Sequence, residues 1–124
     1  MSAHGTLVAF FIPGNLDNPL NGTHGHWSTP ARRRKAWREN TKAAYLASPR
    51  MATAPWTPKR VTLVANVWNR MDSDGLQAAC KSVRDGLVDC GLIDDDGPDS
   101  GHVFLYEQRV ARAQRGVTVS VETL

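Results

Sequence analysis

The stretch VTLVANVWNRMDSDGLQAACKSVRDGLVDC, residues 61–90, decides the fold. Residues 61–68 are rich enough in β-branched and apolar side chains to form a central strand. From residue 75 to residue 90 apolar side chains recur at steps of three and four, which is typical of a helix with one buried side. They are Leu76, Ala79, Val83, Leu87 and Cys90. The stretch therefore predicts a buried strand and then a helix, which Gly91 ends.

Outward from this stretch the chain has the pattern of short strands and one further helix. Residues 7–12, LVAFFI, predict a buried strand, and Pro30 after Thr29 favours a helix over residues 30–47. Residues 102–110 and 116–122 predict two strands, which we expect to pair as a C-terminal hairpin. We therefore expect one α+β domain over residues 1–124, ordered β-α-β-α-β-β, with two helices packed on a mixed sheet.

Length and composition narrow the class of protein. The 124 residues, 41% hydrophobic and 22% charged, suit a single folded domain. The longest apolar run is too short to cross a bilayer and the N-terminus has no signal-peptide pattern, so we expect a cytoplasmic protein without a membrane partner. Cys80 and Cys90 are ten residues apart on the expected helix, roughly 15 Å, which excludes a disulfide.

Positive charge gathers early in the chain, although the net charge is only +3. The cluster contains the single acid Glu39 and six basic residues, which are Arg32, Arg33, Arg34, Lys35, Arg38 and Lys42. Most such runs are solvated helix faces. Because forked guanidinium groups suit phosphate, we predict that these six residues bind the DNA backbone. His26, in a loop with His24, is predicted to contact DNA or to pack, since two histidines alone are poor evidence for zinc.

Asp72 and Asp74 lie where the central strand has ended and the next helix begins. The simplest interpretation is local, with Ser73 or Asp74 capping the helix and Asp72 favouring its dipole. However, residues two apart on an extended backbone point to the same side, and a second acidic run, residues 94–96, follows the same helix. Carboxylates brought together repel unless they share a cation, and their hard oxygen atoms suit Mg²⁺ or Mn²⁺. We therefore predict a metal site; an EF-hand is excluded because its later ligands are missing.

Lys81 is seven residues after Asp74, nearly two helical turns, and Asp85 is four residues further on. The spacing predicts a salt bridge between Lys81 and Asp85. A lysine at such a place is either solvated or holds a phosphate or an attacking water near the metal, and the sequence alone leaves both alternatives open.

The ordered set of residues from Asp72 to Asp96 resembles the RusA family of Holliday junction resolvases. The matching elements are Asp72-Ser73-Asp74-Gly75-Leu76, Lys81, Asp85-Gly86-Leu87, Gly91-Leu92-Ile93 and Asp95-Asp96. Pro13-Gly14, Asn21, His26-Trp27 and Arg32 to Arg38 resemble a phage-type branch of that family. Two features depart from the pattern: Gly75 stands where Asn is common, and Lys81 comes three residues late on the same helical face.

The resemblance implies a magnesium-dependent, structure-selective endonuclease that resolves Holliday junctions, acting as a homodimer on branched DNA in a bacterial or phage-infected cell. It implies catalytic roles for Asp72, Asp74, Lys81 and Asp96, and metal ligands from Asp72, Asp74, Asp96 and, secondarily, Asp95, with Asp94 a bystander. Because Gly75 replaces Asn, the alternative is a relative that binds branched DNA with impaired catalysis. A calcium-binding or protein-interaction module is a third class.

Overall fold

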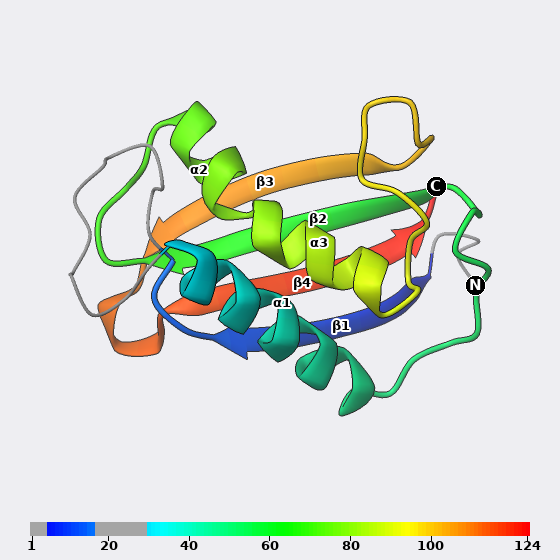
Figure 1. Ribbon diagram of the computed structural model, residues 1–124, viewed down its shortest axis with the longest axis horizontal. Helices are drawn as coiled ribbons and strands as arrows, with labels where there is room; N and C mark the ends of the chain where they lie inside the picture. The colour runs from blue at the N-terminus through cyan, green and yellow to red at the C-terminus, as the bar shows by residue number, and fades with distance from the viewer. Residues whose placement is uncertain (1–4, 17–29) are drawn as a thin grey trace.

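The computed structural model describes residues 5–16 and 30–124, and it has the expected order of elements (Figure 1). The strands and helices are β1 (Thr6–Pro13), α1 (Pro30–Leu46), β2 (Lys59–Val67), α2 (Ser73–Ala79), α3 (Lys81–Asp89), β3 (Val103–Val110) and β4 (Gly116–Thr123), with a short 3₁₀ turn, η2 (Arg112–Gln114), between the last two strands. The predicted α+β fold with a mixed sheet is confirmed.

The predicted C-terminal hairpin is wrong. The sheet order is β1-β4-β2-β3, so β2 separates β3 from β4. β2 runs parallel to β3 and antiparallel to β4. The connection crosses the end of β2, where Asn66 Nδ2 donates to the Gln114 carbonyl at 3.0 Å and the Ala111 amide donates to the Val67 carbonyl at 3.0 Å. Three valines of β4 are fully buried, which favours a central strand with a neighbour on each side.

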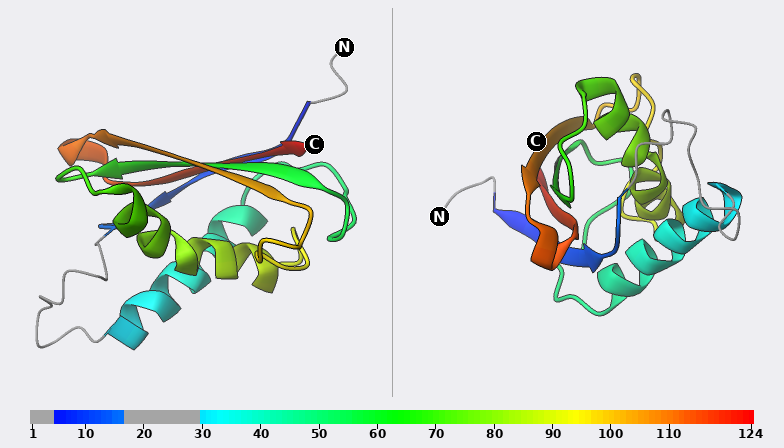
Figure 2. Two further views of the ribbon diagram at one scale, coloured as in Figure 1. Left: turned by 90° about the horizontal axis from the view of Figure 1, so that it is seen from above. Right: turned by 90° about the vertical axis from the view of Figure 1, so that its left-hand side faces the viewer.

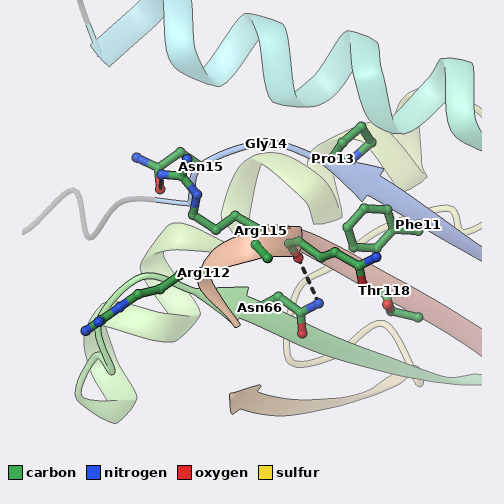
Figure 3. Close-up of a pocket in the computed structure, with 10 residues that line it drawn as sticks. Phe11, Pro13, Gly14, Asn15, Asn66, Arg112, Arg115 and Thr118 are labelled. Carbon is green, nitrogen blue, oxygen red and sulfur yellow. Dashed lines mark hydrogen bonds between the residues drawn. The ribbon is translucent and has the colours of Figure 1, made fainter. Parts of the chain in front are cut away.

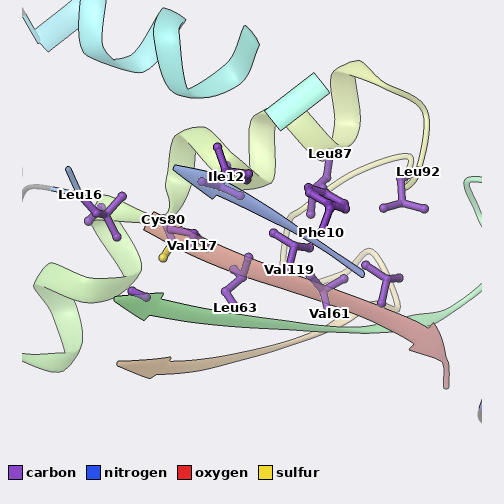
Figure 4. Packing of buried hydrophobic residues seen from close by; sticks show 14 of the residues in the cluster. Phe10, Ile12, Leu16, Val61, Leu63, Cys80, Leu87, Leu92, Val117 and Val119 are labelled. Atoms are coloured by element: carbon purple, nitrogen blue, oxygen red, sulfur yellow. The ribbon is translucent and has the colours of Figure 1, made fainter. Parts of the chain in front are cut away.

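The helices lie on one face of the sheet, and none of the described helices covers the other face (Figure 2). Alternate residues of β2, at positions 61, 63, 65 and 67, point into the core and are at most 1% exposed. They pack against Val83 and Leu87 of α3 and against Ile12 of β1 in a single apolar cluster (Figure 4). The core therefore fixes the ends of β2 relative to the helices that carry the predicted site.

The helix predicted over residues 75–90 is divided at Cys80 into α2 and α3. The hydrogen-bond ladder continues across the division, since the Cys80 amide donates to the Leu76 carbonyl and the Arg84 amide donates to the Cys80 carbonyl. Four residues of the predicted apolar stripe are buried as expected, whereas Cys90 is only partly buried; both cysteines are free thiols. Gly91, with a φ of +79°, ends α3, which confirms its predicted role.

Helices α1 and α3 approach closely where Thr41 faces Gly86. A Cβ added at Gly86 would lie 2.7 Å from the Thr41 Cβ, closer than real side chains approach. Thr41 is fully buried, and its hydroxyl donates to the Trp37 carbonyl at 2.6 Å. The small residue at position 86 thus lets the basic helix α1 lie against the helix that carries Lys81.

Candidate functional site

One acidic cluster, Asp72 and Asp74, follows β2, and the other, residues 94–96, follows α3. Asp72 and Asp74 come after the C-terminal end of β2, whereas residues 94–101 lead into β3, whose first residues pair with the start of β2. In residues 5–16 and 30–124 no three His, Cys, Asp or Glu side chains form a group that is able to hold a metal ion. The described structure therefore does not bring Asp72, Asp74 and Asp96 together, and magnesium stays a prediction.

Asp72 has a local role as the N-cap of α2. Its Oδ1 accepts a hydrogen bond from the Gly75 amide at 2.7 Å. Such a cap is worth about 1 kcal/mol to a helix. Asp74 lies exposed in the first turn of α2, where its charge favours the helix dipole. The local interpretation predicted Ser73 or Asp74 as the helix cap, whereas the structure shows that Asp72 is the cap.

Lys81, by contrast, is held between two carboxylates. Its ammonium lies 2.7 Å from Asp96 Oδ2 and 3.1 Å from Asp85 Oδ1, and the second contact confirms the predicted salt bridge. The hydrogen bond with Asp96 is the main cause that raises the pKa of Lys81. Lys81 is therefore charged at neutral pH and serves as a cation, not as a general base.

Arg84 was not singled out from the sequence, yet it lies beside Asp96. Its Nε is 3.8 Å from Asp96 Oδ2, and Nη1 donates to the Tyr106 hydroxyl at 2.8 Å. Nε is buried and has no hydrogen-bond partner among the described residues. The available signal was its position, three residues after Lys81 on the same helical face. Together Lys81 and Arg84 surround Asp96 with positive charge.

Asp94 belongs to a different network, at the start of β2. Its carboxylate lies 2.8 Å from Nε2 of the buried His102, whose Nδ1 accepts from the Lys59 amide at 3.2 Å. Because Nδ1 accepts, the proton of neutral His102 is on Nε2, which donates to Asp94. This hydrogen bond lowers the pKa of Asp94. Asp94 thus anchors the loop, whereas Asp95 is exposed and Asp96 faces α3.

The basic residues of α1 line two hollows. One, of about 200 Å³, lies between α1 and the α2–α3 junction and is lined in part by Arg33, Arg34 and Lys81. The other, of about 330 Å³, is lined by Ala31, Arg34, Lys35, Arg38, Glu39, Lys42 and Asp89. Arg34 borders both hollows. The structure therefore places Lys81 beside the predicted DNA-binding helix, although no pattern in the sequence links Lys81 to that helix.

Part of this positive charge is already neutralised. Arg38 makes a forked pair with Asp89 of α3, with both nitrogen–oxygen distances at 2.8 Å. The pair raises the pKa of Arg38 and lowers that of Asp89. Lys35 lies 3.9 Å from Glu39. Arg32 is exposed on α1, and His26 lies outside the described residues.

The chain matches none of the protein-family models and none of the curated proteins with which it was compared. The resemblance to the RusA family therefore rests on the motif residues alone. Among the described helices, none is long and apolar enough to cross a membrane.

Proposed function

We propose that this chain is a magnesium-dependent, structure-selective endonuclease that hydrolyses phosphodiester bonds in branched DNA. The observation that supports it best is the hollow shared by Arg33, Arg34 and Lys81, since Lys81 also contacts Asp96, fifteen residues along the chain. The hollow brings three cations together beside an acid, and its lining also includes apolar residues such as Leu16, Trp37 and Ala79. The protein acts as a homodimer in the cytoplasm of a bacterial or phage-infected cell, and its two-fold symmetry suits a two-fold junction.

The cations perform the tasks that need no metal. Arg34, at the border of both hollows, binds backbone phosphate and directs the strand toward Lys81. Lys81 keeps its proton and stabilises the negative charge that develops on the phosphate under attack. Arg84 supports this by keeping Asp96 close to Lys81.

The predicted metal ligands suit magnesium in their chemistry but not in their described placement. Asp72, Asp74, Asp95 and Asp96 all offer carboxylate oxygens, the ligands that Mg²⁺ and Mn²⁺ prefer. However, the described residues hold no group of three such side chains, and Asp96 is engaged with Lys81. An ion shared by the two clusters thus requires a rearrangement of the described structure. When bound, it would activate water and neutralise charge on the phosphate.

The test is cleavage of a synthetic four-way junction with and without Mg²⁺. We expect Asp72→Asn and Asp74→Asn to lower the cleavage rate by at least about 100-fold, because each removes a charged ligand. Both should still bind the junction, since asparagine also caps helices and the basic helix is untouched. Asp99→Asn, an exposed loop acid outside the predicted set, is the matched control. Wild-type cleavage by the Asp72 and Asp74 variants would reject the assignment.

The second candidate is a relative that binds branched DNA without cutting it. Two observations favour it. Lys81 forms a direct ion pair with Asp96, a predicted metal ligand, and Gly75 stands where Asn is common in the family. This candidate predicts selective junction binding with no cleavage in Mg²⁺ or Mn²⁺. Equal affinity for four-way and linear DNA would instead indicate a calcium-binding or protein-interaction module.

A further inference from the structure

Trp68 lies beyond the end of β2, with two guanidinium groups against its indole ring. The ring is large and the residue is 49% exposed. The guanidinium carbon of Arg112 lies 4.8 Å from the ring centroid and that of Arg115 lies 5.3 Å from it. Both arginines belong to the turn between β3 and β4, so the crossover connection brings them to the end of β2.

The other hydrogen-bond partners of these two arginines are neutral. Arg112 donates to the Trp68 carbonyl at 3.1 Å and to Asn69 Oδ1 at 3.4 Å, and Arg115 donates to Asn15 Oδ1 at 3.3 Å. Over the part of the chain that the structure describes, neither has a carboxylate within 4.0 Å. Two like charges held near one ring repel each other, and bound anions offset that repulsion.

The two arginines also line a pocket of about 540 Å³ (Figure 3), within the range of roughly 300–1,000 Å³ typical of small-molecule sites. Its lining combines the apolar surfaces of Phe11 and Pro13 with the side-chain amides of Asn15 and Asn66. Phe11 is 41% exposed, and Asn66 is oriented by its hydrogen bond to the Gln114 carbonyl. Paired cations, an aromatic face and oriented amides suit a nucleotide.

We propose that this pocket binds one nucleotide of an unpaired DNA strand, with Arg112 and Arg115 on the two phosphates that flank it and Phe11 against its base. The choice of DNA rests on the proposed function. Trp68, whose ring both arginines contact, precedes Asp72 by four residues, so at most roughly 14 Å of chain joins this residue to the acids. A strand that leaves the branch point is thereby held close to Asp72 and Asp74.

The probe is a fluorescent oligothymidylate, titrated by anisotropy in EDTA so that no cleavage intervenes. Relative to the wild-type chain, the Arg112→Ala/Arg115→Ala double variant should bind at least 10-fold more weakly. Its salt dependence should flatten by about 1.4 in slope, the value for two lost contacts with single-stranded phosphates. Arg60→Ala is the matched control, because Arg60 is at the other end of β2 in a partly buried pair with Glu122, 3.5 Å away; it should change the affinity less than 2-fold.

Two results would overturn the inference. One is an unchanged affinity of the double variant, with a thermal midpoint that shows it to be folded. The other is complete competition by inorganic phosphate at an ionic strength matched with chloride, which would make the site one for free phosphate. Failure of the proposed function gives a different result. If the wild-type chain never cuts junctions but binds the oligonucleotide through these arginines, the endonuclease proposal is wrong and the inference about the pocket still holds. If the wild-type chain cuts junctions and the double variant binds the oligonucleotide normally, only the inference about the pocket is wrong.

Discussion

The two cationic regions of this molecule differ in what balances their charge. Along α1 and α3, carboxylates form ion pairs with the cations: Arg38 pairs with Asp89, and Lys81 pairs with Asp96 and Asp85. At the turn after β3, Arg112 and Arg115 meet only carbonyl and amide oxygens and an indole ring among the described residues. The first region is dense in sequence and partly neutralised, and the second is sparse and open.

The difference shows that a run of basic residues does not measure the charge available to a ligand. A polyanion that binds Arg38 has to compete with a forked carboxylate pair, whereas the described partners of Arg112 are neutral and easier to displace. Helix packing decides which cations are paired, because Asp89 belongs to α3 and reaches Arg38 only across the α1–α3 contact.

The largest effect on the paired region should come from Gly86. Gly86→Ala places a Cβ 2.7 Å from the Thr41 Cβ and 3.1 Å from the Arg38 carbonyl, so α1 has to move away from α3. We expect a loss of about 1–3 kcal/mol in the free energy of unfolding, measured by urea denaturation, as for other overpacked cores. Ala43→Ser, at an exposed site of α1, is the control and should stay within about 0.5 kcal/mol. Equal stability of Gly86→Ala and the wild-type chain would show that the helices are not in close contact.

The sequence predicted the elements of the fold because their signals are local. The alternation of β2 and the three- and four-residue spacing from Leu76 to Leu87 each lie within one element, and both are confirmed. Strand pairing is not local. β3 and β4 are separated in the sequence by a short turn that is typical of hairpins. However, η2 crosses the end of β2, so that β2 lies between β3 and β4 in the sheet. The division at Cys80 was also missed, because the apolar stripe continues through it.

The site shows the same limit. The Lys81–Asp85 pair was predicted because it needs only helical spacing, one turn apart. The contacts of Asp96 with Lys81 and Arg84, and of Asp94 with His102, depend on how the loop after α3 folds back, which no spacing rule gives. The basic turn was visible in the sequence, but its position beside Trp68 follows from the crossover connection.

A smaller effect separates Arg34 from Arg38 on the same helix. Arg34→Ala should weaken junction binding and reduce the salt slope by about 0.9, the value for one lost contact with duplex phosphate. Arg38→Ala should change the slope less, because its charge is already paired with Asp89. Both variants remove one guanidinium from α1, so each is the matched control for the other. Equal losses of slope would show that the Arg38–Asp89 pair opens freely when DNA binds.

The smallest effect concerns pH. Because the hydrogen bond from Arg38 lowers the pKa of Asp89 in the folded chain, this carboxylate contributes stability above its unfolded pKa, about 3.9. The contribution is lost as pH falls through the lower folded pKa, when Asp89 takes up a proton and the pair breaks. Asp89→Asn should therefore reduce stability at pH 7 and leave it nearly unchanged near pH 2, so that its urea midpoint varies less with pH than that of the wild-type chain. Parallel pH profiles for the two chains would mean that the pair is screened by solvent and that Arg38 is as available to DNA as Arg34.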